Sequence, residues 1–399
     1  MATPLISLLC LHLAYSLPVP SGYSLNLNNE ENVLSPQLRY EVLAALGTPA
    51  QSFSLLLDTA LSVLVVNDAQ CWDCPSSQRF NRSASRSYRP VERMEIGGAA
   101  AELGLEEVVL GSMRVLNQTV VSVWESADLG YDGADGVLVS DRKGLSPGSP
   151  NIVSTMLEQG LISAPVFAVY FDNRYTPNDP DRSSQSVLSL GYWNLSAYSS
   201  ASDFMYVPVN TSRGLWELTL TTAFFEEKPL ITSPQSAIID STENRLMVPE
   251  ASYRILHSTI CNKLSLRCKD TTSKWNCKAG VPTGLPDITL HFGDIETRLT
   301  PENYIDVWSG QCHLRLGYRE GSQDWVLGTG FMHEYYMLFD LQGKRVGLAQ
   351  VEQEERQWGV VLTLFGMGLI VVVFGVMVYV VRVKLAKDKS MGEPLLTCG

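Results

Sequence analysis

The sequence predicts a mainly β protein that ends in a single membrane-spanning helix, and three observations support this prediction. Short runs of apolar, β-branched and aromatic residues recur along the chain, separated by Gly, Pro, Asn and Ser turns. Windows that favour a helix are few, at 152–159, 250–260 and 301–306. One long run near the C-terminus, in contrast, carries no charged residue.

The expected strands are short, and two of the segments that contain them are alike. We expect strands at 54–57, 62–66, 107–110, 166–171, 218–221, 288–292 and 337–339. Segments 53–66 and 235–249 each carry apolar residues, then Asp, a hydroxyl residue and a second apolar strand. This internal duplication is weak, because Asp-Thr and Asp-Ser are also common in ordinary turns and helix caps.

Composition excludes several classes of partner. The 399 residues are 45% hydrophobic and 18% charged, which is typical of a packed protein. The net charge of −12 argues against nucleic acid, since binding phosphates requires a basic face. The five histidines show no ligand spacing, so we expect no metal site and no cofactor.

Both ends of the chain read as membrane-targeting segments. Residues 5–17 are mostly apolar, and Ala14 and Ser16 form a small-x-small cleavage pattern, so 1–16 is expected to be a signal peptide and 17–37 a short N-terminal segment. A buried N-terminal helix is the alternative. Residues 358–381 are long enough to cross the hydrocarbon core as a helix. Lysines and arginines follow this run and glutamates precede it, which places the tail 382–399 in the cytosol and predicts type I topology.

Cysteines and glycosylation sequons between these ends suit the secretory pathway. Six cysteines lie there, an even number that suits three disulfides: Cys71, Cys74, Cys261, Cys268, Cys277 and Cys312. A redox or metal-binding role for the Cys-x-x-Cys pair at 71 and 74 is an alternative. Four N-x-S/T sequons lie in the same segment, at Asn81, Asn117, Asn194 and Asn210.

Several stretches resemble, in order, the signatures of the pepsin-like aspartic proteases. VLGTGFMHEYYMLFDLQGKRVGLAQV at 326–351 is similar to the C-terminal signature of that family. Further matches are YEVLAALGTPAQSFSLLLDT at 40–59, DGVL at 135–138, LSLGYWNLSAYSS leading into MYVPVNTSRGLWELTL at 188–220, and SAIIDST at 236–242. The resemblance spans about 38–353, and the C-terminal anchor is most similar to the arrangement of the beta-secretases.

The resemblance implies a two-lobed, mainly β pepsin-like fold, with an N-terminal lobe at 38–195 and a C-terminal lobe at 196–353. It implies that Asp58 and Asp240 form the catalytic pair and that Thr59 and Ser241 lock the two loops together. It also pairs Cys71 with Cys74 and Cys277 with Cys312, and leaves Cys261 and Cys268 as an extra local bridge.

The surroundings of the aspartate pair depart from the family pattern. The glycines expected after each Asp-Thr or Asp-Ser are Ala60 and Thr242, and the hydroxyl residues expected next are Leu61 and Glu243. Glu243 would set a further negative charge beside Asp240. Val139 replaces an expected glycine in the first lobe, whereas Gly328 keeps it in the second, and Met94 stands where the flap hairpin at 93–104 normally has Tyr.

Two functions therefore remain open. The first is a membrane-anchored aspartic endopeptidase, hydrolysing peptide bonds with a water held between Asp58 and Asp240. The second is a catalytically impaired pseudoprotease that binds peptide or protein in the cleft between the lobes. Either would be a monomer with its lobes in the lumen or outside the cell, resident at the cell surface or in endosomes.

Overall fold

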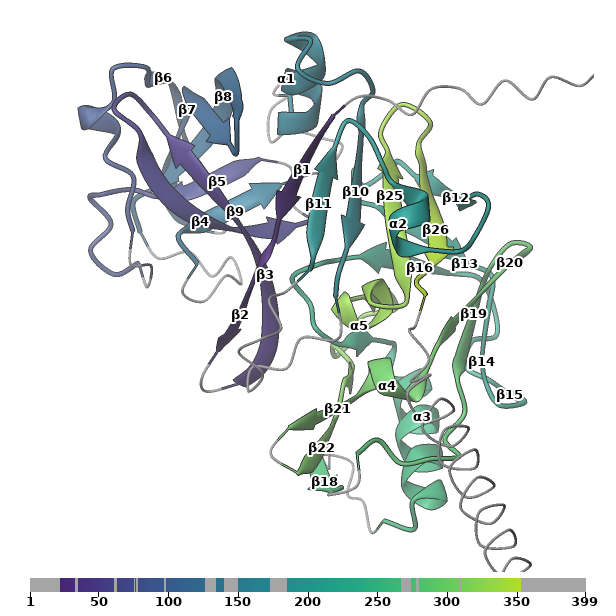
Figure 1. The fold of residues 1–399 in the computed structure, drawn as a ribbon. Helices are drawn as coiled ribbons and strands as arrows, with labels where there is room; N and C mark the ends of the chain where they lie inside the picture. Colours follow the sequence, from purple (N-terminus) through teal and green to yellow (C-terminus); the bar gives the residue numbers. More distant parts are fainter. Residues whose placement is uncertain are drawn as a thin grey trace, which may run out of the picture. The chain divides into compact units, whose positions relative to one another are not determined.

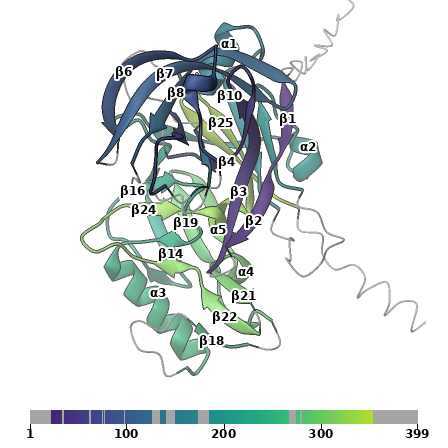
Figure 2. The ribbon, with the colours of Figure 1, turned by 90° about the vertical axis from the view of Figure 1, so that its left-hand side faces the viewer.

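Strands dominate the computed structural model of this chain. It describes residues 22–352 apart from 33–34, 61–62, 75, 77, 97, 126–133, 140–149, 173–184, 267–273, 278–279 and 309. Most of the described strands belong to two large sheets, drawn in Figures 1 and 2.

The first sheet has eight strands and comes from the N-terminal part of the chain. Its order is β2 (Asn28–Asn32), β3 (Ser35–Leu46), β4 (Gln51–Asp58), β9 (Gly136–Val139), β5 (Leu64–Asn67), β8 (Met113–Val123), β7 (Ala99–Leu110) and β6 (Arg89–Ile96). The short 3-10 helix η1 spans Arg82–Ala84, and α1 (Ile152–Glu158) lies beside β8 (Figure 1).

The second sheet has eleven strands and draws on both ends of the described chain. Its order is β1 (Tyr23–Asn26), β11 (Val187–Leu190), β10 (Val166–Tyr170), β25 (Tyr335–Asp340), β26 (Arg345–Gln350), β12 (Met205–Asn210), β13 (Glu217–Leu220), β16 (Gln235–Ile239), β24 (Trp325–Leu327), β17 (Leu246–Met247) and β23 (Leu316–Gly317).

Two small sheets and four further helices complete the C-terminal part. One small sheet contains β15 (Lys228–Pro229), β14 (Thr222–Phe225), β19 (Ile288–Phe292) and β20 (Ile295–Leu299). The other contains β18 (Lys274–Asn276), β22 (Gln311–Leu314) and β21 (Ile305–Trp308). The helices are α2 (Leu195–Tyr198), α3 (Glu250–Lys263), α4 (Pro301–Tyr304) and α5 (Thr329–Met332).

Five consecutive strands of the first sheet are repeated, with the same pairing, in the second. The order β3–β4–β9–β5–β8 has its counterpart in β13–β16–β24–β17–β23. In both sets the successive pairs are antiparallel, parallel, antiparallel and parallel. The weak duplication in the sequence is therefore a duplication of topology.

Large apolar side chains of the second sheet form much of the core. Trp216 is fully buried, with its ring 5.0 Å from that of Phe339, which stacks on Phe167 at 4.4 Å. Buried aromatic pairs of this kind stabilise a fold beyond the apolar area that they remove from water. Trp325 is also fully buried, and its indole nitrogen donates to Gln235 at 2.7 Å.

The structure agrees with most of the local predictions and corrects one of them. The strand expected at 288–292 coincides with β19, and the helical windows at 152–159 and 250–260 lie at α1 and α3. The window at 301–306 was wrong beyond Tyr304, because Ile305 starts β21 and pairs with Leu314.

The predicted membrane segments lie beyond the described residues. Within residues 22–352, as far as they are described, no helix is both long and apolar enough to cross a bilayer. The expected signal peptide at 1–16, the span at 358–381 and the tail at 382–399 all lie outside the described residues.

Candidate active site

The two duplicated loops each begin with an aspartate at the end of a strand. Asp58 is the last residue of β4 and is paired in register with Val139 of the parallel strand β9. Asp240 follows β16 directly, and its backbone N–H donates to the carbonyl of Leu327 in the parallel strand β24 at 3.2 Å. The same topology therefore positions both carboxylates.

Four buried hydrogen bonds join the two loops across the two sheets. Thr59 N–H donates to Ser241 Oγ at 3.1 Å, and Ser241 N–H donates to Thr59 Oγ1 at 3.0 Å. The Thr59 hydroxyl donates to the carbonyl of Ile239 at 3.0 Å, and the Ser241 hydroxyl donates to the carbonyl of Leu57 at 2.7 Å. Since each aspartate precedes one of these hydroxyl residues, the network brings Asp58 and Asp240 to one junction.

The two carboxyl groups meet different surroundings. Asp58 is 4% exposed, and its Oδ1 accepts the backbone N–H of Ala60 at 2.6 Å. Asp240 is partly exposed, and its Oδ1 accepts both the backbone N–H of Thr242 at 2.9 Å and the Thr242 hydroxyl at 2.6 Å.

Thr242 supplies a contact that the sequence was expected to have lost. Glu243 occupies the position where the family pattern places a hydroxyl residue that bonds to the carboxylate. The structure provides a hydroxyl one residue earlier, from Thr242 to Asp240. On the first loop the corresponding Leu61 lies outside the described residues.

The negative charge that Glu243 was expected to add beside Asp240 is paired with Arg245. Its Oε1 accepts the backbone N–H of Arg245 at 3.1 Å and Nε of the same residue at 2.9 Å, and its Oε2 accepts Nη2 at 3.3 Å. A guanidinium held in this way neutralises the carboxylate locally. Sequence reasoning missed Arg245, although its spacing of two residues from Glu243 was visible.

A second arginine, far away in the sequence, bonds to the same loop. Arg315 Nε donates to the carbonyl of Asn244 at 3.0 Å, and its Nη2 donates to Thr329 Oγ1 at 3.1 Å. No short-range pattern could have revealed Arg315, because it lies 71 residues from Asn244 in the chain.

The hairpin expected to act as the flap is formed by β6 and β7. Met94 pairs with Ala101 across this hairpin and packs against an apolar cluster. The cluster consists of Val63, Val65, Ile96, Ala99, Ala101, Leu103, Val121 and Val123. Tyr88, the nearest tyrosine before the hairpin, instead donates to Glu102 at 3.0 Å and packs edge-on against Phe80, so its hydroxyl is already engaged.

Cysteine pairing follows the expectation where the residues are described. Cys71 bonds to Cys74, and Cys277 bonds to Cys312. Cys261 is also disulfide-bonded, and Cys268, its expected partner, lies outside the described residues.

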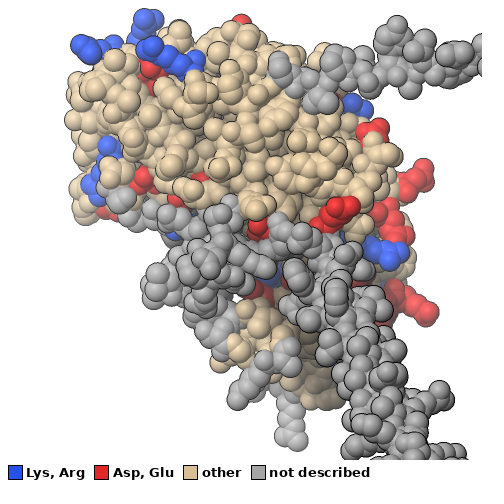
Figure 3. Space-filling view, viewed as in Figure 1, with Lys and Arg blue, Asp and Glu red and all other residues tan. Residues whose placement is uncertain are grey.

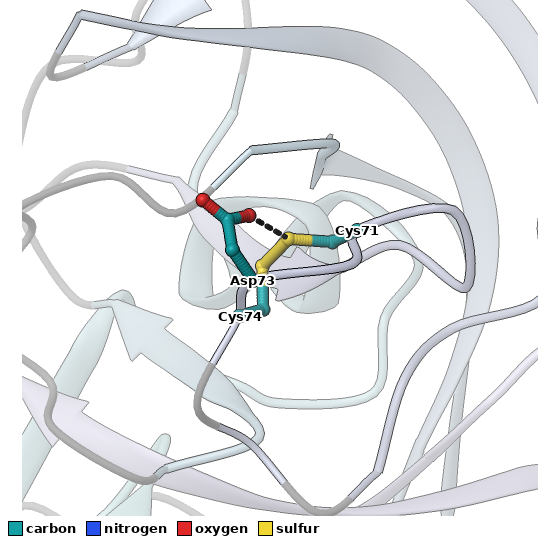
Figure 4. A group of neighbouring side chains, drawn as sticks. All are labelled: Cys71, Asp73 and Cys74. Atoms are coloured by element: carbon teal, nitrogen blue, oxygen red, sulfur yellow. Dashed lines mark hydrogen bonds between the residues drawn. A yellow bond between two sulfur atoms is a disulfide. The ribbon is translucent and has the colours of Figure 1, made fainter.

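The Cys-x-x-Cys group is drawn in Figure 4. Asp73 lies between the two cysteines in sequence, with its Oδ1 3.4 Å from Cys71 Sγ. The ligand atoms of Cys71, Asp73 and Cys74 lie close enough to hold a metal ion. Because the two sulfurs are bonded to each other and buried, neither is a thiolate available to a metal.

All four sequon asparagines are exposed: Asn81, Asn117, Asn194 and Asn210.

Charged side chains are distributed unevenly over the described surface. On the face shown in Figure 3, basic and acidic side chains gather at the margins, with a broad uncharged area between them.

Comparison with known proteins decides the family. A model of the eukaryotic aspartyl proteases matches residues 39–351. This chain belongs to the eukaryotic aspartyl protease family. Pepsin A of Bos taurus is 27% identical over 321 residues, covering 77% of this chain and 82% of its own length. Pepsin A of Canis lupus familiaris is 27% identical over 355 residues, with coverages of 83% and 88%. Cathepsin E of Aquarana catesbeiana is 26% identical over 326 residues, with coverages of 77% and 78%.

The match to the aspartyl protease family includes both loops that carry Asp58 and Asp240. The match begins within β3 and ends just after β26, so both duplicated sets of strands lie inside it apart from the first residues of β3. An aspartyl protease needs two carboxylates at one junction, and the residues beside Asp58 and Asp240 form the hydrogen bonds that cross this junction.

Proposed function

We propose that this chain is an aspartic endopeptidase that hydrolyses peptide bonds with a water held between Asp58 and Asp240. The observation that carries the proposal is the crossed set of four hydrogen bonds made by Thr59 and Ser241. Two turns that were independent of each other would not require side chains that bond from one loop to the other. Two departures from the family pattern are partly compensated. The Thr242 hydroxyl bonds to Asp240 although position 243 has no hydroxyl, and Arg245 pairs with the added charge of Glu243.

The chemistry requires one shared proton. Two carboxyl groups at one junction do not ionise together easily, so one keeps its proton while the other acts as a base. The ionised carboxylate takes a proton from the water, whose oxygen attacks the carbonyl carbon of the peptide. The protonated carboxyl gives its proton to the carbonyl oxygen. Collapse of the tetrahedral intermediate breaks the C–N bond: the leaving nitrogen takes one proton from the pair, and a hydroxyl of the intermediate returns one, so the pair again holds a single proton. These roles belong to the pair as a unit.

The substrate would be an extended peptide or protein segment lying in the cleft between lobes 38–195 and 196–353. Pepsin-like proteases bind peptides there, and the relatives that match this chain include pepsins and cathepsin E. Their likeness at about a quarter identity supports the class of substrate, and the chain is proposed to act as a monomer.

A second candidate, a pseudoprotease that binds peptide without cutting it, is favoured by the side chains after the aspartates. Ala60 and Thr242 place a Cβ where the family has glycine, and Met94 offers no hydroxyl from the β6–β7 hairpin. A Cβ at such a position adds bulk where a substrate backbone would approach.

One assay separates the two candidates. The full-length chain is incubated with a mixed peptide pool from about pH 3.5 to 7.5, with and without a statine-type inhibitor. We expect inhibitor-sensitive cleavage that disappears in Asp58→Asn and persists in the control Asp324→Asn, whose ion pair with Arg213 lies on the surface. Folded protein that binds the inhibitor but cleaves nothing would favour the pseudoprotease. Folded protein with neither property would refute both candidates.

The membrane arrangement is a further part of the proposal. We infer a signal peptide at 1–16, a type I span at 358–381 and a cytosolic tail at 382–399, with glycans on the four exposed asparagines. Exposure of Asn81, Asn117, Asn194 and Asn210 supports this inference, because an acceptor must be reachable from solvent. Peptide N-glycosidase should lower the apparent mass of the protein, and a C-terminal tag should be accessible only after cells are permeabilised, whether at the surface or in endosomes. A tag stained on intact cells would refute the topology.

A further inference from the structure

A buried histidine joins the first sheet to the segment that follows α5. His333 is 3% exposed, and its Nε2 lies 2.6 Å from the hydroxyl oxygen of Tyr40 in β3. Tyr40 is fully buried in the first sheet, whereas His333 immediately precedes Glu334 and strand β25 of the second. The two residues are 293 positions apart, so the contact ties together distant parts of the chain.

The other ring nitrogen of His333 has no polar partner. Its Nδ1 is buried and makes no hydrogen bond among the described residues. Aromatic rings surround the imidazole, with Tyr40 at 6.1 Å and Phe171 at 6.4 Å, both edge-on. The protonated ring carries a proton on both nitrogens, so it holds a buried Nδ1–H without an acceptor, a cost that the neutral ring protonated only on Nε2 avoids.

Burial and one neighbouring positive charge also oppose a positive imidazole. Burial, and then the positive charge of Arg315, hold the pKa of His333 well below its ordinary value. Asp172, which follows β10, raises the pKa of Tyr40 by electrostatic repulsion of the tyrosinate, and Tyr170 raises it in the same way. On the same segment as His333, Glu334 accepts the backbone N–H of Thr300 at 2.8 Å, so its carboxylate has a partner elsewhere.

Arg315 connects this contact to the candidate active site. The guanidinium that repels a charged His333 also holds the carbonyl of Asn244 and the hydroxyl of Thr329. Asn244 belongs to the loop that starts at Asp240, and Thr329 begins α5. A charge appearing on His333 would therefore disturb the group that anchors the Asp240 loop.

We propose that His333 is an acid-sensitive switch that keeps β3 and the Asp240 loop in place while neutral and releases them when protonated. Protonation of the Nε2–H tautomer adds a proton to Nδ1, which leaves a buried unpaired N–H and sets the positive imidazole against the positive charge of Arg315. As far as it concerns the candidate site, this inference rests on the proposed function. It implies a working range above strongly acidic pH, because the imidazole must be neutral while the aspartate pair keeps one proton.

The sign of the pH dependence follows from linkage. The neutral imidazole is favoured by folding, so its contribution to stability is complete above the ordinary histidine pKa of about 6.5 and is lost as the pH falls below it. Below pH 6.5, each unit by which the pH falls raises the unfolding constant about tenfold, until the pKa of the folded state is reached. From pH 7.5 to 5.0 the unfolding constant thus rises about 30-fold through His333, as long as the folded-state pKa lies below that range.

The first test compares the pH dependence of unfolding in full-length protein. Urea unfolding is followed by tryptophan fluorescence between pH 7.5 and 5.0 for wild type, His333→Gln and the control His291→Gln, which lies on β19 and is partly exposed. We expect His333→Gln to lose the 30-fold step and His291→Gln to keep it. Equal steps in wild type and His333→Gln would overturn the proposal.

A second measurement covers failure of the glutamine variant to fold. Histidine NMR of the wild type should show one imidazole that stays neutral well below pH 6.5 and protonates only as tertiary structure is lost. Tyr40→Phe should remain folded at pH 7.5 and keep this resonance. If the His333 imidazole titrates near pH 6.5 in folded protein, the switch does not exist.

A third measurement separates this inference from the proposed function. The affinity for a statine-type inhibitor is measured at pH 7.0, 6.0 and 5.0 in wild type and His333→Gln. We expect the wild type to lose affinity relative to the variant as the pH falls. Absence of inhibitor binding in both proteins at every pH would refute the proposed function while the unfolding data still decide the switch. Binding in both with the same pH profile would refute control of the site by His333.

Discussion

At the scale of single residues, the hydroxyl groups of Thr59 and Ser241 each make two buried hydrogen bonds to the opposite loop. In each case one bond is donated to a carbonyl and the other is accepted from a backbone N–H. Removing a hydroxyl therefore leaves two buried backbone groups without partners, and each such group costs about 1–3 kcal/mol. These residues join the two loops, and the two proposed catalytic aspartates stand directly before them.

Replacing Ser241 by Ala should lower the free energy of unfolding by about 3 kcal/mol, because Thr59 N–H and the carbonyl of Leu57 both lose their partners. Thr59→Val should cost a similar amount. Urea unfolding of both single variants and the double variant gives the coupling, and we expect the double variant to lose less than the sum. Thr59→Ser keeps the hydroxyl and serves as the control. Additive losses would show that the two side chains act independently.

At the scale of elements, the turn between β24 and α5 requires glycine at 328. A Cβ built there would lie 2.2 Å from the carbonyl oxygen of Glu243 and 2.4 Å from that of Arg245, both backbone atoms. Backbone cannot shift as a side chain can, so the Asp240 loop would have to move. The first sheet has Val139 at the expected position of the other glycine, which makes the two copies of this turn unequal.

Gly328→Ala should therefore destabilise the protein by about 3 kcal/mol or more, through a clash with the loop that carries Asp240. The matched control is Gly284→Ala, where φ is +84° and a Cβ meets nothing within 4 Å, so only about 1 kcal/mol of backbone strain is expected. Thermal unfolding of both variants tests this difference. Equal losses would indicate that space at Gly328 is unimportant.

The disulfides offer a second prediction about elements. Cys277 and Cys312 are 35 residues apart, whereas Cys71 and Cys74 are separated by three. Loop-closure entropy predicts that replacing the longer-range pair by serine costs about 4 kcal/mol and replacing the shorter pair about 2 kcal/mol. Denaturant unfolding under non-reducing conditions measures both losses. The reverse order would mean that native contacts around Cys71 outweigh the entropy of the unfolded chain.

At the scale of the whole molecule, tyrosine hydroxyls are buried throughout the described residues. Burial raises the pKa of Tyr40, Tyr304, Tyr335 and Tyr336, and burial together with Glu102 raises that of Tyr88. The neutral form of each is favoured by folding. Their contribution to stability is thus complete below the ordinary tyrosine pKa of about 10 and is lost as the pH rises above it.

We therefore expect the protein to unfold in alkali, with these five tyrosines ionising only as it does so. Tyrosinate absorbance recorded alongside circular dichroism from pH 9 to 13 should show an early phase from exposed tyrosines and a late phase that coincides with unfolding. Ionisation of all 16 tyrosines near pH 10 in folded protein would contradict the burial described here.

Local order in this chain could be predicted wherever neighbouring residues decide it. The run at 288–292 alternates in burial along β19, and Asn151 caps α1 by accepting the N–H of Ser154 at 2.8 Å. Such signals lie within a few residues of the element that they specify. The helical window beyond Tyr304 failed because Ile305 pairs with Leu314, a contact that local propensity does not contain.

In the candidate site, too, the sequence identifies the residues but not the contacts between them. Asp58, Asp240, Thr59 and Ser241 could be named from the sequence, since a duplicated Asp-hydroxyl pattern follows two similar strands and matches a family signature. Their mutual hydrogen bonds, the bond from Thr242 and the anchoring by Arg315 could not be named, because each joins groups whose geometry depends on several turns and strands at once.

The sequence by itself determined the mainly β class and the family, and it predicted the two aspartates of the candidate site, because strand periodicity, turn residues and ordered motifs are properties of neighbouring residues. Only the tertiary structure decided how the departures from the family pattern act. It turned Glu243 toward Arg245, brought the Thr242 hydroxyl to Asp240 and buried His333 against Tyr40. The physical reason is that hydrogen bonds and charges act over a few ångströms, and which groups come that close is set by the packing of strands far apart in the chain.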